Sequence, residues 1–301
     1  MRSRIFRRIT IAAAFSLMLA GCGAESTGGE GLRVVATTTI LGDVARNVVG
    51  DGAGVEVLIP LGTDPHDYQA SSQQVAAIRQ ADLVIANGLL LEEGLQDVLR
   101  SLTEDGANIL ELAPSLDPLP FATEAGAEDP HVWLDPIRMA EAAQIIATEL
   151  TAISGGAQWL ARAESYGAEL VAADEQIETI LAAVPSAARR LVTNHDALGY
   201  FAARYGFEIV GTVIPGGSTL ADPSSAELAG LVRVLEEQGV TAIFAETTEP
   251  SALAQAVAAE IGDEIEVVDL YTGSLGEPGS GADTLIGLLL TNATRIAEAL
   301  T

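Results

Sequence analysis

The 301-residue chain has no lysine, one cysteine (Cys22) and three histidines. All of its basic residues are arginines, 15 against 42 acidic residues, so the formal net charge is −27. A surface this acidic repels nucleic acid and anionic lipid, and we expect no nucleic-acid partner. It serves either solubility or the attraction of cations. One thiol cannot form an internal disulfide, so stability must come from an apolar core, which the hydrophobic fraction of 49% permits.

The N-terminus has the order of an export signal. Four arginines in the first eight residues precede the apolar run 9–19, which is too short for a lasting membrane span, and small residues follow. The sequence Leu19-Ala20-Gly21-Cys22 resembles a bacterial lipobox, which implies cleavage before Cys22 and lipid attachment to it. The alternative is an ordinary buried cysteine. We therefore expect a signal peptide over 1–21 and an extracytoplasmic protein anchored by lipid to the bacterial cell membrane.

The remaining 280 residues are enough for two lobes. Residues 22–31 are small, polar and glycine-rich, which is typical of a flexible tether. Short apolar strands then alternate with amphipathic helices, a pattern that predicts an α/β fold with mostly parallel sheets flanked by helices. One long helix, from about Ala157 to Ala183, interrupts the alternation. We predict an N-terminal lobe over 32–155, a rigid linking helix over 156–185 and a C-terminal lobe over 186–301.

The histidines lie at or near the ends of predicted strands. Ligand crevices in open α/β sheets lie beyond the carboxyl ends of the strands, and imidazole is a good zinc ligand. His66 and His131 share the tripeptide Asp-Pro-His, in which proline restricts the backbone, and His195 ends the strand "RLVTN". Each histidine also has a carboxylate within two residues that can accept its second ring N–H. A shared metal site and three separate structural histidines both remain open on this pattern alone.

Six segments resemble one known family, the cluster A-I solute-binding proteins of zinc and manganese ABC importers. They are "GTDPHDYQAS", "LVIANGLLLE", "DPHVWLDP", "TNHDALGYFAARYG", "AIFAETT" and "LYTGSLGEPGSGADT", in the family's order. The resemblance implies that His66 and His131 are the two ligands of the first lobe. His195 takes the third position, where zinc-type members have histidine and many manganese-type members have glutamate. The fourth ligand is usually an acid, but this chain has Gly273 there.

The missing acid leaves the fourth contact open. Water can fill it, or Glu246, Asp67 or Asp269 can substitute as a fourth ligand or support the ligands from behind. Three neutral nitrogens favour Zn²⁺, and the loss of an oxygen moves the site further from the alternative, Mn²⁺. The resemblance implies a receptor, not an enzyme, that captures the ion and delivers it to an ABC permease powered by its ATPase. We expect a monomer.

Two other functions are possible from the sequence. Three histidines with an open position also describe a zinc-dependent hydrolase or hydratase, with Glu246 or Asp67 as the general base. The chain has neither a GxSxG nor an HExxH motif. Some relatives have been described as surface adhesins, but this sequence offers no separate adhesive module.

Overall fold

The computed structural model describes residues 31–121, 126–262 and 265–301. The predicted signal peptide and Cys22 lie outside these ranges, as does all of the predicted tether except Gly31. Residues 31–301 form one compact unit.

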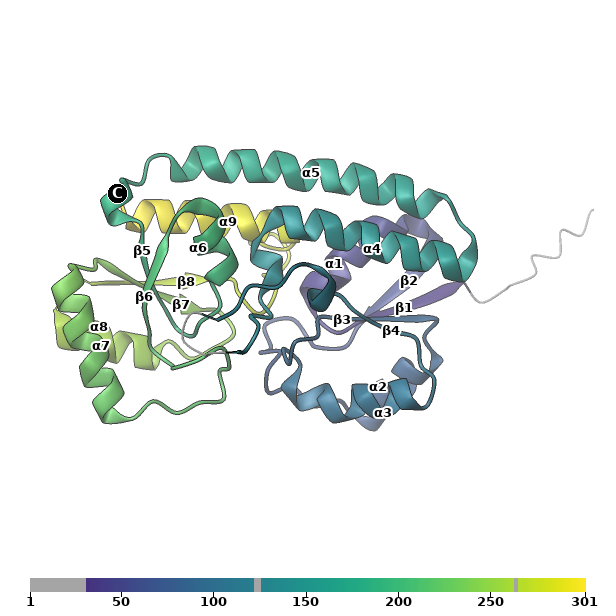
Figure 1. The fold of residues 1–301 in the computed structure, drawn as a ribbon, viewed down its shortest axis with the longest axis horizontal. Helices are drawn as coiled ribbons and strands as arrows, with labels where there is room; N and C mark the ends of the chain where they lie inside the picture. The colour runs from purple at the N-terminus through teal and green to yellow at the C-terminus, as the bar shows by residue number, and fades with distance from the viewer. Residues whose placement is uncertain (1–30, 122–125, 263–264) are drawn as a thin grey trace, which may run out of the picture. The chain divides into compact units, whose positions relative to one another are not determined.

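Two four-stranded sheets, both entirely parallel, organise this unit (Figure 1). The first has the order β2-β1-β3-β4, and the second the equivalent order β6-β5-β7-β8. The central strands β3 and β7 are buried along their whole length, as expected for sheets covered by helices on both faces. The strands are β1 (Leu32–Ala36), β2 (Ala53–Val57), β3 (Leu83–Ala86), β4 (Ile109–Glu111), β5 (Arg190–Thr193), β6 (Glu208–Thr212), β7 (Ala242–Glu246) and β8 (Glu266–Leu270).

Helices cover both faces of each sheet (Figure 1). On the first sheet, α1 (Thr39–Val49) and α4 (Pro136–Ser154) lie on one face, and α2 (Ser72–Gln80) and α3 (Gln96–Glu104) on the other. On the second sheet, α6 (Gly199–Tyr205) and α9 (Leu285–Ala299) lie opposite α7 (Ser225–Gln238) and α8 (Ala252–Ile261). The predicted α/β fold with flanked parallel sheets is confirmed.

The long helix α5 (Gln158–Leu181) packs against α4 of the first half and α9 of the second. Its 24 residues extend about 36 Å. Buried side chains recur every three or four positions along it, at Trp159, Ala163, Tyr166, Leu170, Ala173, Asp174, Ile177 and Leu181. Together with α1, α4, α6 and α9, this stripe belongs to a single hydrophobic cluster that includes residues of both sheets. The two sheets therefore share a continuous core.

Local sequence signals set the helix ends. Asp135 caps α4 by accepting from the backbone N–H groups of Ile137 and Arg138, and Gly155 ends it in the left-handed conformation at φ 71°. The sequence of residues 89–102 predicts one helix, but α3 begins only at Gln96, so this prediction is wrong at its start. A short 3₁₀ turn, η2 (Glu93–Leu95), precedes α3, and a tight turn occupies the residues before it.

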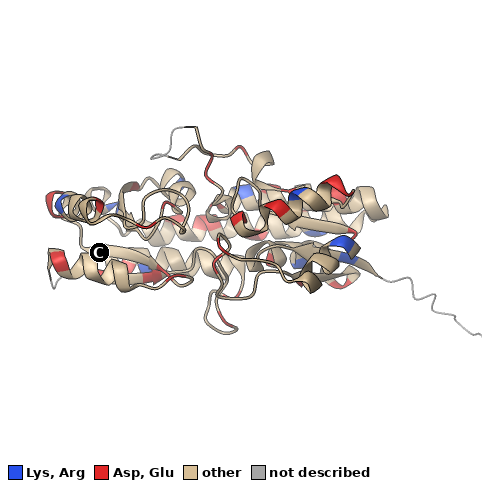
Figure 2. Cartoon of the chain, turned by 90° about the horizontal axis from the view of Figure 1, so that it is seen from below, with Lys and Arg blue, Asp and Glu red and all other residues tan. Residues whose placement is uncertain are grey.

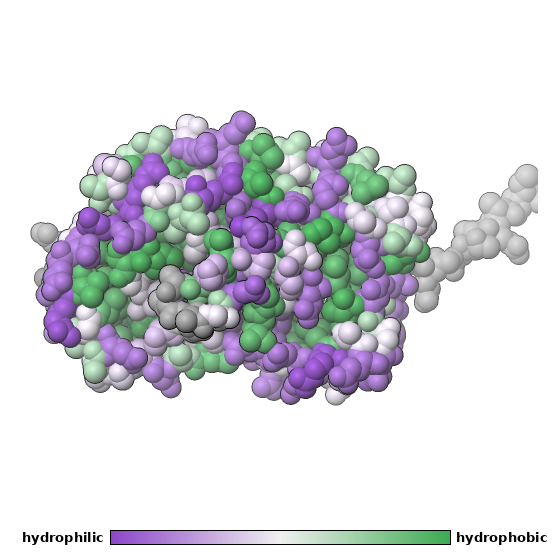
Figure 3. All heavy atoms as spheres, in the orientation of Figure 1, coloured by the Kyte–Doolittle hydropathy of each residue, from purple (hydrophilic) through white to green (hydrophobic). Residues whose placement is uncertain are grey.

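Polar and apolar residues are mixed on the surface. Acidic residues are spread over helices and loops around both sheets, with few basic ones among them (Figure 2). On the face drawn in Figure 3, hydrophilic and hydrophobic residues are interspersed. Within the described ranges, no helix has the length and apolar character needed to cross a membrane.

Candidate metal centre

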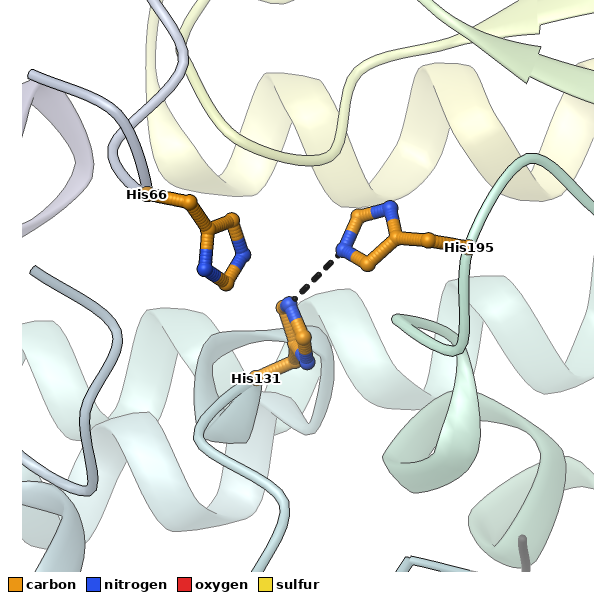
Figure 4. Close-up of side chains that lie close together, drawn as sticks. All are labelled: His66, His131 and His195. Carbon is orange, nitrogen blue, oxygen red and sulfur yellow. Dashed lines mark hydrogen bonds between the residues drawn. The ribbon is translucent and has the colours of Figure 1, made fainter. Parts of the chain in front are cut away.

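The structure brings the three predicted histidines together between the two sheets (Figure 4). One ligand atom from each ring lies within 4.8 Å of the others. All three residues are buried, at 2%, 1% and 3% exposure for His66, His131 and His195. Ring centroids of His131 and His195 are 5.0 Å apart, whereas His66 lies 5.6 and 5.5 Å from them. The convergence expected from the strand ends is therefore present, with His66 slightly withdrawn.

The repeated Asp-Pro-His tripeptide forms the same backbone turn twice. The His66 N–H donates to Asp64 Oδ1 at 3.0 Å, and the His131 N–H donates to Asp129 Oδ1 at 2.9 Å. Such Asx turns fix the chain direction two residues after the aspartate, and the proline between restricts it further. The repetition therefore presents two imidazoles from equivalent, preformed loops.

Buried carboxylates hold the rings of His131 and His195. Asp129 Oδ1 lies 2.7 Å from Nδ1 of His131, and Glu246 Oε1 lies 2.5 Å from Nδ1 of His195. A carboxylate at Nδ1 keeps the proton there and turns the Nε2 lone pair toward the centre. The two Nε2 atoms are 3.1 Å apart (Figure 4). Two metal–nitrogen bonds of about 2.0–2.1 Å at a tetrahedral angle need about 3.3 Å, so both nitrogens can contact one ion.

The pKa values of these two histidines shift in opposite directions. Burial lowers the pKa of His131 well below 6.5, and the neighbouring imidazoles lower it further. Burial also acts to lower the pKa of His195, but the Glu246 carboxylate outweighs it and the net shift is upward. Burial acts to raise the pKa of Glu246, but the contact with His195 acts in the opposite direction, and the net shift of this pKa is downward. A proton on either Nε2 atom can be shared across their 3.1 Å contact, and the upward shift in the pKa of His195 favours its ring as the carrier.

The pKa of Asp129 shifts in the opposite direction to that of Glu246. Burial raises the pKa of Asp129 to about 7, although the His131 backbone N–H acts in the opposite direction. A cation bound at the far side of the His131 ring would favour the ionised carboxylate.

His66 has a different carboxylate partner. Its Nδ1 lies 3.4 Å from Glu93 Oε1, beyond the usual hydrogen-bond range, and neither ring nitrogen has a hydrogen-bond partner. The contact with His66 lowers the pKa of Glu93, although partial burial opposes it, and a hydrogen bond with Ser218 lowers it further. Glu93 is not among the site residues predicted from the sequence. The one feature that could have indicated it is the acidic pair Glu92-Glu93 shortly after the end of a strand.

A cavity of about 580 Å³ leads to this part of the centre. His66 and Glu93 line it from the first half, together with Phe121. Gly217 and Ser218, from the loop after β6, line it from the second. A Cβ on Gly217 would lie 1.9 Å from the Phe121 ring, so only glycine permits this close approach. The cavity gives a route from solvent to His66.

A strained turn follows β3. Leu89 and Leu90 have φ values of 53° and 65°, in the left-handed region that non-glycine residues rarely adopt. The buried carboxylate of Glu92 holds the turn, accepting from Thr37 Oγ1 at 2.6 Å and from the Asn87 N–H at 2.7 Å. Burial raises the pKa of Glu92, against these hydrogen bonds.

The same turn connects the loops of two histidines. Asn87 Nδ2 donates to the Pro130 carbonyl at 2.9 Å, one residue before His131. The Gly94 N–H donates to the His66 carbonyl at 3.1 Å. The Asn87-Gly88 pair therefore lies in a brace between the two Asp-Pro-His loops.

The candidates for a fourth ligand lie in different places. Glu246 is behind His195, at its outer nitrogen, which suits a supporting position. Asp67 is exposed, and Asp269 is exposed in β8. Among the described residues, the one group of three or more potential ligands that converges consists of the histidines, with no carboxylate.

Gly273 borders the His66 loop. A Cβ at this position would lie 3.0 Å from Pro65 Cδ and 3.2 Å from Thr248 Oγ1. A side chain here therefore needs a small shift of its neighbours, and it would start next to the proline that precedes His66.

Known proteins resemble the chain over nearly its whole length. The family model ZnuA, "Zinc-uptake complex component A periplasmic", matches residues 34–299. The manganese-binding lipoprotein MntA of Halalkalibacterium halodurans is 32% identical over 291 residues, 95% of each chain. The zinc-binding protein TroA of Treponema pallidum is 28% identical over 288 residues, 92% of each chain.

Solved structures agree with these matches. The periplasmic zinc-binding protein TroA from Treponema pallidum superposes with a TM-score of 0.84 at 26% identity, covering 90% of this chain and 99% of its own. A Mn-bound periplasmic metal-binding protein from Candidatus Liberibacter asiaticus superposes with a TM-score of 0.79 at 25% identity, covering 90% and 100%. The chain therefore belongs to the family of metal-binding solute-binding proteins that serve ABC importers.

Proposed function

We propose that this protein binds Zn²⁺ through His66, His131 and His195 outside the cytoplasm and delivers it to the permease of an ABC importer. The observation that carries the proposal is the convergence of three buried imidazoles, with ligand atoms within 4.8 Å of one another. Neutral nitrogen donors suit zinc, and water can complete a tetrahedral site with three protein ligands.

The choice of zinc over manganese rests on this chain's own donors. Relatives are named for either metal: MntA for manganese and TroA for zinc. Manganese prefers more oxygen ligands, and the converging set contains none. The resemblance implies an acid at the position of Gly273, so we expect one oxygen donor fewer at this site than the family pattern has.

Capture is an exchange of cations. Imidazole must be deprotonated to bind a metal, so Zn²⁺ competes with protons for His195, whose pKa is shifted upward. Asp129 and Glu246 accept the outer N–H groups and stabilise the rings in the binding orientation. At the permease the exchange runs in reverse, and the ion leaves the three histidines. The ATPase that powers the permease lies on the inner side of the membrane.

Calorimetric titration of the metal-free protein tests the metal. We expect tight Zn²⁺ binding, weak Mn²⁺ binding, and loss of zinc in His195→Ala measured by mass spectrometry after growth in mixed-metal medium.

Gly273→Asp should strengthen Mn²⁺ binding relative to Zn²⁺ because it adds an oxygen donor, with Gly273→Ala as the steric control. Tight Mn²⁺ and feeble Zn²⁺ binding by the wild type would refute the choice of zinc.

Location and domain division are part of the proposal. We infer that residues 1–21 are removed, that Cys22 carries the lipid, and that 22–31 tether the lobes 32–155 and 186–301, which the helix region 156–185 links. The names of relatives such as the MntA lipoprotein support the anchor. Cys22→Ser should abolish labelling by a radioactive fatty acid, and undiminished labelling would exclude this residue.

The family consists of solute-binding proteins and not of enzymes, which removes the zinc-dependent hydrolase or hydratase from consideration. The monomeric state stays a prediction.

A further inference from the structure

The three histidines of the centre are not held equally. The rings of His131 and His195 each contact a carboxylate that is buried to 2–3% exposure, at 2.7 and 2.5 Å. Their Nε2 atoms already stand 3.1 Å apart. The spacing of this pair is therefore close to that of two ligands of one metal ion.

His66 repeats the backbone turn of His131 but not its side-chain anchor. In the turn at His131, one oxygen of Asp129 serves both the backbone N–H and the ring. In the turn at His66, Asp64 accepts the backbone N–H, and its second oxygen accepts from Thr219 Oγ1 at 2.5 Å. Asp64 is thus engaged elsewhere, and the imidazole of His66 faces Glu93 instead.

Glu93 is placed differently from the other two carboxylates. Its side chain is 35% exposed, it lines the cavity beside His66, and Ser218 from the loop after β6 hydrogen-bonds to it. The 3.4 Å separation from His66 Nδ1 leaves that nitrogen without a formed hydrogen bond. A small ring rotation or a shift of Glu93 would form it and turn Nε2 toward the centre.

We propose that Glu93 is a positioning residue for His66, and that His66 is the ligand that closes on the ion last and leaves it first. The ion first meets the preformed His131–His195 pair. His66 then completes the set as Glu93 accepts its Nδ1–H, a carboxylate–histidine–metal arrangement like the other two. This inference rests on the proposed function.

The test measures zinc dissociation from the full-length protein into excess chelator. We expect Glu93→Ala to release Zn²⁺ about 10- to 100-fold faster, the range for lost supporting partners. Glu93→Gln should recover much of the wild-type rate because its amide oxygen can still accept from Nδ1. The matched control is Glu128→Gln, an exposed acid on the same cavity, and its rate should equal that of the wild type.

A second readout separates positioning from folding. The Co²⁺-loaded protein should change its visible absorption in Glu93→Ala, since the intensity of these bands follows coordination number, whereas the melting temperature of the metal-free variant should match the wild type. Unchanged release from Glu93→Ala would overturn the inference, and so would a Gln variant as fast as the Ala variant. If wild type binds no Zn²⁺ at all, the proposed function fails instead.

Discussion

At the residue scale, carboxylates behind the imidazoles decide how the centre competes with protons. Glu246 stabilises a charged His195 across a 2.5 Å contact, whereas burial keeps His131 neutral. Protons and a metal ion therefore compete chiefly at the His195–Glu246 pair. Acidity and metal occupancy are linked through that pair.

This linkage predicts a pH dependence with a defined sign. Because the pKa of His195 is raised, its proton is retained above pH 6.5, and Zn²⁺ affinity should begin to fall there as pH drops. Glu246→Gln removes the charge that raises this pKa while burial remains, so the fall should move to lower pH. Calorimetry between about pH 8 and pH 5.5 measures the midpoint. Glu260→Gln, an exposed acid on α8, is the control; identical midpoints for all three proteins would contradict the assignment.

Which carboxylate meets which ring was only partly predictable. A search within two residues of each histidine finds Asp129 for His131, because the Asx turn folds the aspartate back onto it. Local spacing does not reach Glu93, the partner of His66, and Glu246 is predicted only as a possible fourth or supporting ligand, with no ring assigned to it. These two contacts join segments brought together only by packing, which local spacing does not encode.

At the element scale, the apolar runs predict the strands well. The prediction that fails is the start of the helix after β3, where the chain forms a turn. The runs "AIFAE" and "EVVDL" predict strands over 242–246 and 266–270, and these are the limits of β7 and β8. Of the two, β7 is buried throughout, whereas β8 lies at the sheet edge with Glu266 and Asp269 exposed. "LLLEE" after β3 has helical spacing, yet Leu89 and Leu90 are left-handed. Glu92 stabilises this turn because it accepts hydrogen bonds from the distant Thr37 and from the nearby Asn87 N–H. Helix propensity does not include such contacts, so it cannot predict the turn.

Helix α5 allows a direct test of its packing stripe. Leu170→Ala removes a fully buried side chain from the shared core, and we expect a loss of about 2–5 kcal/mol in the free energy of unfolding. The adjacent Val171 is 43% exposed, so Val171→Ala should change stability by less than about 0.5 kcal/mol. Urea unfolding of the metal-free proteins gives both values. Equal losses in the two variants would show that this stripe does not stabilise the fold.

At the scale of the described unit, the shared core restricts how its halves can move. Side chains of α5 lie in one cluster with residues of both sheets, so a wide hinge motion would expose apolar surface at about 25 cal/mol per Å². The parallel sheets and the long helix were predictable from the alternation of elements. The continuity of the core was not, since it depends on α4, α5 and α9 packing side by side.

Solution scattering tests this restriction. We expect nearly superimposable profiles for the metal-free and zinc-loaded protein, because loop and side-chain adjustments around His66 suffice for binding. A marked compaction on adding Zn²⁺ would indicate a hinged clamp and contradict the rigid arrangement. The Glu93→Ala protein serves as a control, since its profile should follow the wild type in both states.

The hydrophobic cluster common to both sheets also bears on the order in which the chain folds. Cutting the chain near Gly155, between α4 and α5, would leave each fragment with an exposed apolar face. In the whole chain these two faces pack against each other. The face of α4 that packs against α5 stays uncovered until residues 158–181 have been synthesised, so the first half cannot complete its packing alone.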